Sequence, residues 1–155
     1  MTRARSLRKK IFRVLAVLWM AVIFAFSARN ADLSTEDSHR AGRIAAELMV
    51  PGFDELTPEE QEQIILRLDH PVRKTAHMAE YTVLGFFLGG SFHEPFTAWG
   101  LGALYAVTDE LHQIFVPGRS GQISDVAIDS IGVFLGIMVW LLAVRLGKGF
   151  VKQKK

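Results

Sequence analysis

Four apolar stretches divide the chain, and each has about the length of a helix that crosses a membrane. They cover about residues 11–27, 72–92, 96–116 and 124–146. A helix needs about 20 mainly apolar residues to cross a hydrocarbon core of roughly 30 Å. With 155 residues, half of them hydrophobic, the chain has room for one core. The pattern therefore predicts an all-α fold in which residues 1–155 form a single membrane domain, a bundle of four transmembrane helices.

The connection over residues 29–71 is polar and too long to lack structure in a compact domain. It predicts two short amphipathic helices, the first capped by Ser34 and the second beginning with the capping-box spacing of Thr57 and Glu60. Their apolar faces would be formed by Ala41, Ile44, Ala45, Leu48 and Met49 in the first helix and by Ile64, Ile65 and Leu68 in the second. These helices would rest on the membrane surface, cover the bundle or lie in solvent.

Basic residues crowd both ends of the chain, directly beside apolar stretches. They are Arg3, Arg5, Arg8, Lys9, Lys10 and Arg13 at the start, and Arg145, Lys148, Lys152, Lys154 and Lys155 at the end. Basic termini also occur in nucleic-acid-binding proteins, and a basic start before an apolar run also occurs in signal peptides. We interpret both as orientation signals instead, which predicts a multi-pass cell-membrane protein with cytoplasmic termini, an external 29–71 loop and no nucleic-acid partner.

Ionisable side chains interrupt the second, third and fourth stretches, all at the same end of the spans. They are Lys74, His77, Glu80, Asp109, Glu110, His112, Asp125 and Asp129. A charge at the centre of a membrane helix costs about 2.5–3.5 kcal/mol, so such residues indicate a functional site. Antiparallel neighbours would bring these ends together, beside Arg119 in the turn between the third and fourth stretches. The sequence thus predicts one polar site, facing outward.

Helical spacing places Lys74, His77 and Tyr81 on one face, with Glu80 at its edge. His77, Glu80 and Asp109 are candidates for acid–base catalysis. Lys74 and Arg119 suit an anionic group. The remaining candidates for ligand binding are Tyr81, Glu110, Gln113, Asp125 and Asp129.

The sequence is also compatible with two other roles for this polar cluster, a metal site and a structural role. Histidine and carboxylate ligands for a metal are present, but their spacing matches no metal motif, so no metal site is predicted. The same residues could also serve only to hold the helices together. The chain has no cysteine, which excludes disulfides and thiolate chemistry, and no cofactor is indicated.

Two pairs of glycines are spaced four residues apart within the second and fourth stretches. They are Gly85 with Gly89 and Gly132 with Gly136. Small residues at this spacing let membrane helices approach closely. We therefore predict that these pairs serve helix packing.

The polar motifs resemble those of the VanZ family. KTAHMAEY, from Lys74 to Tyr81, and DELHQIFVPGR, from Asp109 to Arg119, follow the family patterns KxxHxxEY and DExxQxFxPxR. An Asp-Val pair at Asp125 and the glycine-rich last stretch follow in the same order, so the resemblance covers about residues 74–136. The external loop departs from the family pattern, as does Asp129, where asparagine is more usual.

The resemblance implies a small multi-helix membrane protein, since the members of the family are of this kind. The family's named member is associated with low-level resistance to the glycopeptide teicoplanin. We therefore expect a VanZ-like cell-envelope protein that engages an amphiphilic ligand, a lipid or a glycopeptide, at the outer leaflet and affects teicoplanin susceptibility. The alternatives are a small transporter or proton-coupled permease, with Glu80, Asp109 and Asp125 as proton relay, and a membrane enzyme that uses the histidine and carboxylates. An oligomer is compatible with each of them.

Overall fold

A computed structural model gives the fold of the chain. It describes the backbone of residues 2–29, 31–119 and 121–153, and their side chains except those of residues 2, 4, 5, 31–37 and 148–153. The elements, in order, are α1 (Thr2–Ser27), α2 (Ala31–Met49), the short 3-10 helix η1 (Phe53–Glu55), α3 (Pro58–Ser91), α4 (Pro95–Gln113) and α5 (Ile123–Gln153). Within the described residues there is no strand, which confirms the prediction of an all-α fold.

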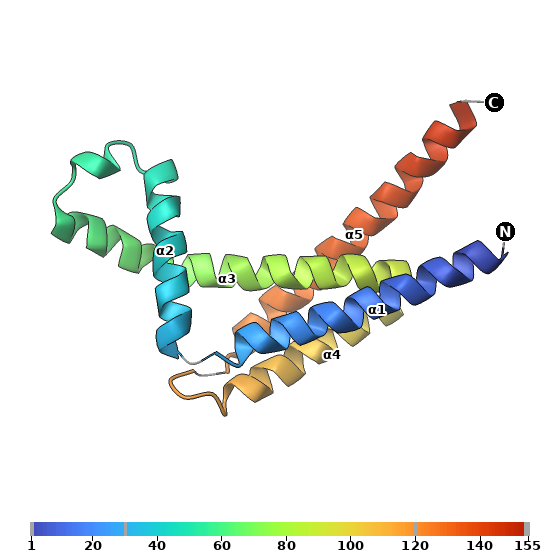
Figure 1. The fold of residues 1–155 in the computed structure, drawn as a ribbon, viewed down its shortest axis with the longest axis horizontal. Helices are drawn as coiled ribbons and strands as arrows, with labels where there is room; N and C mark the ends of the chain where they lie inside the picture. Colours follow the sequence, from blue (N-terminus) through green and yellow to red (C-terminus); the bar gives the residue numbers. More distant parts are fainter. Residues whose placement is uncertain (1, 30, 120, 154–155) are drawn as a thin grey trace.

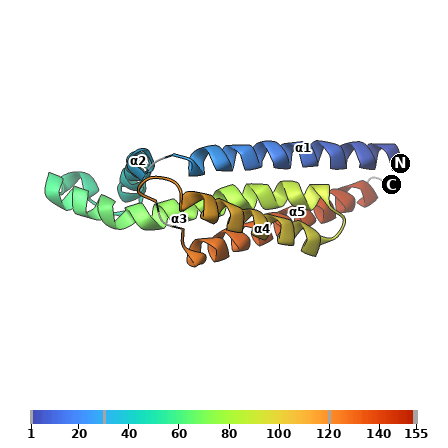
Figure 2. The same ribbon diagram turned by 90° about the horizontal axis from the view of Figure 1, so that it is seen from below.

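The helices α1, α3, α4 and α5 form an elongated bundle with both chain termini at the same end (Figures 1 and 2). We call this the terminal end; α3 ends and α4 begins there. At the opposite end, which we call the cap end, α2 runs across the direction of the bundle (Figure 1). The cap end is where α1 and α4 finish and α5 starts, so it carries the predicted polar site.

Close packing of α3 against α5 forms the centre of the bundle, and glycines make it possible. A side chain at Gly136 would collide with the backbone oxygen of Thr82, and one at Gly85 would collide with the backbone oxygen of Val133. Gly132 lies in the same way against Met78. Three of the four predicted glycines therefore face the backbone of the neighbouring helix, and Gly89 lies against the Trp140 ring.

Apolar side chains remain exposed over much of the bundle's outer surface. Examples are Val17 on α1, Leu104 on α4 and Phe134 on α5. Such broad apolar exposure is rare in water-soluble monomers and marks contact with a membrane or partner. Two helices, over Ser6–Ser27 and Ile123–Gly147, are long and apolar enough to cross a membrane.

The count of four membrane spans stays a prediction. The predicted spans at 72–92 and 96–116 coincide with the second part of α3 and with α4. These helices are less apolar, because they carry the polar residues of the cap end. Their membrane placement is therefore argued below as a proposal.

The second loop helix and the second span are not separate, as the sequence suggested, but form the single helix α3. The predicted capping box at Thr57 and Glu60 is confirmed as its start. Pro71 lies inside the helix, where it lacks the N–H that would bond the preceding turn. The helix continues through it, with a bend in Figure 1, and the carbonyl of Pro71 accepts a hydrogen bond from the Thr75 hydroxyl (2.8 Å).

The other loop helix, α2, differs from its prediction in two ways. It begins at Ala31, so Ser34 lies inside it and is not its cap. Its contact with α3 is made by small residues, Gly42 and Ala46, which allow a close approach to Ile65. The predicted apolar residues Ile44, Leu48 and Met49 are instead exposed. The predicted face of the second loop helix is confirmed, since Ile65 is buried with Ile64 and Leu68 packed beside it.

Candidate functional site

An open cavity of about 240 Å³ lies at the cap end, between α1, α2, α3 and the turn before α5. We call it the arginine cavity. Its lining combines apolar side chains (Phe26, Ala41, Val72 and Ala76) with polar and charged ones (Arg29, Ser38, Arg73, His77, Glu80 and Arg119). A lining of this mixed kind suits a ligand with both a charged and an apolar part.

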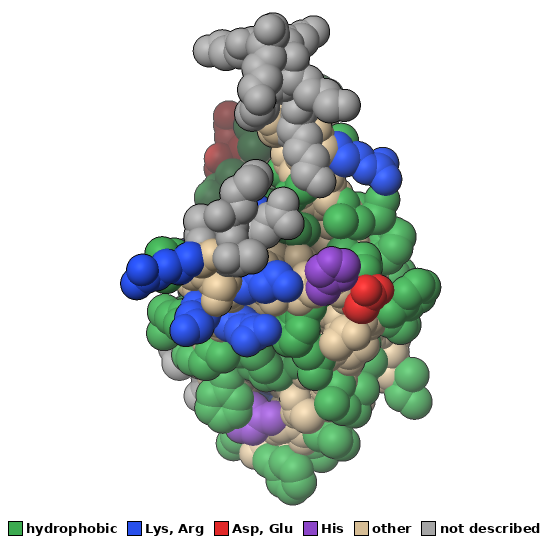
Figure 3. Space-filling model, turned by 90° about the vertical axis from the view of Figure 1, so that its right-hand side faces the viewer, with side chains coloured by type: hydrophobic (Ala, Val, Ile, Leu, Met, Phe, Trp, Pro, Cys, Tyr) green, Lys and Arg blue, Asp and Glu red, His purple; other side chains and the backbone are tan. Residues whose placement is uncertain are grey.

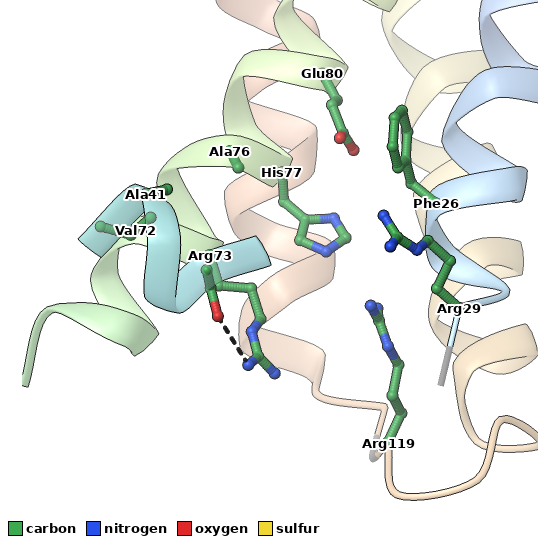
Figure 4. A pocket seen from close by; sticks show the side chains of 10 residues that line it. Phe26, Arg29, Ala41, Val72, Arg73, Ala76, His77, Glu80 and Arg119 are labelled. Carbon is green, nitrogen blue, oxygen red and sulfur yellow. Dashed lines mark hydrogen bonds between the residues drawn. The ribbon is translucent and has the colours of Figure 1, made fainter. Parts of the chain in front are cut away.

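Two guanidinium groups point into the same part of this cavity. Figure 4 shows those of Arg29 and Arg119 ending near each other, with His77 and Glu80 beside them. Arg29 lies two residues after the end of α1, and Arg119 follows Gly118, whose φ of 75° turns the chain back toward the bundle. A left-handed φ of this kind is readily adopted only by glycine.

The third arginine of the cavity is held by neighbours. Arg73 donates hydrogen bonds from Nη2 to the Ser38 hydroxyl (3.3 Å, dashed in Figure 4) and to Asp69 Oδ2 (3.2 Å). The Ser38 hydroxyl in turn donates to Asp69. These contacts join α2 to α3, so they fix the wall of the cavity as well as the position of one cation.

Arg119 is a cation in an unfavourable place. Burial lowers its pKa from the usual value, and the nearby Arg73 cation lowers it further, while Asp109, Glu110 and Glu80 oppose the shift. Burial and a like charge both destabilise the charged form of a group. An anion bound beside Arg119 would relieve both effects.

A second, smaller cavity of about 110 Å³ lies on the other side of Arg73, His77 and Arg119, which line both spaces. We call it the aspartate cavity. Lys74 Nζ and Asp125 Oδ1 form an ion pair of 2.8 Å on its wall. Asp129 also lines it and is fully buried, and neither of its carboxylate oxygens has a hydrogen-bond partner among the described residues.

Behind the cavities, a buried hydrogen-bond network joins the helix ends. Asp109 Oδ2 accepts from the Ser27 hydroxyl (2.9 Å) and from Gln113 Nε2 (3.2 Å), which ties α4 to α1. Glu110 Oε2 accepts from the backbone N–H of Gln122 (2.7 Å). The Gln113 side-chain oxygen accepts from Arg119 Nη1 (3.2 Å). The network therefore positions Arg119 and the start of α5.

The predicted site residues are brought to the cap end, but they separate into three groups. His77, Glu80 and Arg119 line the arginine cavity; Lys74, Gln113, Asp125 and Asp129 line the aspartate cavity; Tyr81, Asp109 and Glu110 are buried behind them. The buried Tyr81 hydroxyl has no hydrogen-bond partner among the described residues. His112 faces elsewhere, because its ring stacks on that of Phe24 with a centroid distance of 4.5 Å.

No three histidine, aspartate or glutamate side chains of the described residues come together closely enough to hold a metal ion. The described residues therefore do not group the metal ligands considered from the sequence as a metal centre; these are His77, Glu80, Asp109, Glu110, His112 and Asp125. The cationic groups in the arginine cavity would also repel a metal cation.

The sequence of the chain matches a known protein family. The sequence model of the VanZ/LLP1 family matches residues 12–144, most of the chain. The chain belongs to this family. No curated protein and no solved structure matches it. Membership of the VanZ/LLP1 family, together with the apolar α1 and α5, indicates a membrane protein of a family linked to glycopeptide resistance.

In this VanZ/LLP1 chain, several cavity residues were missed by the sequence analysis. Arg29 and Phe26 lie at the end of the first apolar stretch, where a change from apolar to basic residues was the available signal. Arg73 lies one helical turn before His77, a spacing that places both on one face. Ser27, which bonds Asp109, had no distinguishing signal.

Proposed function

We propose that this VanZ/LLP1 protein binds the anionic headgroup of an amphiphile in the arginine cavity, at the outer face of the cell membrane. The chemical class of ligand is a lipid-linked cell-wall precursor or a lipoglycopeptide such as teicoplanin. Its charged part would lie between Arg29 and Arg119, and its apolar part would leave past Phe26 and Ala41. His77 and Glu80 would contact the ligand, whereas Asp109 would position the helices.

The convergence of Arg29, Arg73 and Arg119 on one cavity is the observation that carries this proposal. Guanidinium groups bind phosphate and carboxylate in a bidentate manner, and such charge-assisted bonds are among the stronger ones in proteins. The cavity also has apolar walls and is open.

Four spans and cytoplasmic termini complete the proposal. Lysine and arginine side chains gather at the terminal end of the bundle, among apolar ones (Figure 3). Basic residues next to membrane spans favour the cytoplasmic side. With α3 and α4 spanning as well as α1 and α5, the cap end and both cavities would face outward.

Labelling of single cysteines tests this topology, because the natural chain has none. Gln63→Cys lies on an exposed part of α3 near the cap end, and His93→Cys on the exposed turn at the terminal end. In intact cells, an impermeant thiol reagent should label position 63 and reach position 93 only after permeabilisation. Labelling at 93 and protection at 63 would place the arginine cavity in the cytoplasm.

Binding to purified protein tests the ligand class. We expect a polyprenyl diphosphate and teicoplanin, titrated separately into detergent-solubilised protein, to bind the wild type, at least one of them in the arginine cavity. Arg29→Gln and Arg119→Gln should each weaken that binding at least tenfold, because a hydrogen bond to a charged group contributes about 1.5–3 kcal/mol.

The matched control is Arg67→Gln, which removes an exposed arginine of α3 that lines neither cavity. Its affinity should equal that of the wild type. A thermal melt of each variant separates lost binding from lost folding, since Arg119 also bonds Gln113. Equal affinity of all three variants for both probes would refute the anion site.

A further inference from the structure

An apolar hollow on the surface of the bundle shares no lining residue with either polar cavity. Between α1 and α4 there is an apolar groove of about 490 Å³, which we call the α1–α4 groove. It exists because α1 packs chiefly on α3 and only sparsely on α4. Its walls are Val17 and Met20 on α1 and Leu101 and Leu104 on α4, and its floor is Leu84 and Leu88 on α3.

The two ends of the groove differ. Toward the cap end, the Tyr105 hydroxyl donates a hydrogen bond of 2.7 Å to the backbone oxygen of Met20 and so joins the two walls. Arg13, Ser91 and Phe92 line it toward the terminal end. Seven residues separate Arg13 from Met20, so the groove runs about 10 Å along the helix.

Arg13 places a positive charge at the end of the groove nearer the terminal end of the bundle. Its guanidinium lies 5.7 Å from the centre of the Phe92 ring, beside the last residue of α3. Among the described residues, no carboxylate forms an ion pair with it. A cation at the end of membrane helices, next to an apolar groove, complements a phosphate at the headgroup level with its acyl chain alongside.

We propose that the α1–α4 groove holds one acyl chain of an anionic phospholipid from the leaflet at the terminal end, with the lipid phosphate bound by Arg13. The volume falls within the range of about 300–1,000 Å³ that is usual for small-molecule sites. This lipid would fill the gap between α1 and α4 and so hold the first helix against the rest of the bundle. It is a structural lipid, in the opposite leaflet from the amphiphile of the arginine cavity.

Native mass spectrometry of the detergent-solubilised protein tests this site. Phosphatidylglycerol and phosphatidylcholine with identical acyl chains are added in turn. The wild type should retain one phosphatidylglycerol at least ten times more strongly than phosphatidylcholine. Arg13→Gln should remove this preference, whereas Arg8→Gln should keep it, because Arg8 lies over the Trp140 ring and does not line the groove.

A second pair of variants tests the groove itself. Val14 and Val17 lie on neighbouring turns of α1, and their side chains are similarly exposed. Of the two, only Val17 lines the groove. Val17→Trp should abolish retention of the lipid, and Val14→Trp should not. Arg119→Gln should retain it too, which separates this site from the arginine cavity. Equal retention of both lipids by the wild type, or equal effects of Arg8→Gln and Arg13→Gln, would overturn the proposal.

Discussion

Gly136→Ala is expected to remove most of the folded protein from the membrane. The added Cβ would collide with the backbone oxygen of Thr82 and lie 2.6 Å from the backbone nitrogen of Phe86. These neighbours are backbone atoms of α3, so no side-chain rotation can relieve the clash. Overpacking typically costs about 1–3 kcal/mol, and a backbone collision belongs at the upper end of that range. Abundance and a melting curve by fluorescence-detected size exclusion measure the loss.

Gly100→Ala and Gly147→Ala are the matched controls. Both glycines lie in helices, and nothing stands within 4 Å of the position a Cβ would take. Alanine has a higher helix propensity than glycine by up to about 1 kcal/mol. These variants should therefore melt at or above the wild-type temperature. If Gly136→Ala were as stable as Gly100→Ala, the close contact of α3 with α5 would be wrong.

The helices were predictable because their apolar and polar runs are long and their boundaries carry recognisable residues. Pro95 starts α4, Gly118 turns the chain before α5, and the Thr57 capping box starts α3. The continuity of α3 through Pro71 was not predictable, because proline usually ends a helix. The first part of α3 packs on α2 through Ile65 and Ala46, a tertiary contact that the local sequence around Pro71 does not show.

The buried face of α2 was not predictable from hydrophobicity. Hydrophobicity favoured Ile44, Leu48 and Met49 as its buried face, yet the contact with α3 uses Gly42 and Ala46. Close approach of two backbones requires small residues, and a hydrophobicity pattern does not register them.

The position of the candidate site followed from helix direction alone, but its division did not. Antiparallel helices bring Lys74, Asp109 and Asp125 to one end, as predicted. Which of them lines a cavity depends on the rotation of each helix about its axis. Packing of Gly85 and Gly132 sets that rotation for α3 and α5, and it places Tyr81 in the core while His77 lines both cavities. Their roles in binding or catalysis remain predictions.

Asp109→Leu and Glu80→Leu should have opposite effects on stability, although each removes one carboxylate from the cap end. Asp109 is buried and accepts hydrogen bonds from Ser27 and Gln113, so leucine leaves the Ser27 hydroxyl without its acceptor and leaves Gln113 Nε2 with Glu110 Oε1 as its remaining one. Each buried donor left unsatisfied costs about 1–3 kcal/mol. We therefore expect a clearly lower melting temperature and lower abundance for Asp109→Leu.

Glu80 lines the arginine cavity, and its side chain forms no hydrogen bond or ion pair with the described residues. Its replacement by leucine should leave the melting temperature within a few degrees of the wild type. The change also removes a negative charge beside Arg29 and Arg119. It should therefore leave the affinity of the protein for a polyprenyl diphosphate unchanged or increase it. Melting curves and the same titration measure both properties. If Glu80→Leu unfolds the protein as Asp109→Leu does, Glu80 is a structural partner and its assignment as a residue that contacts the ligand is wrong.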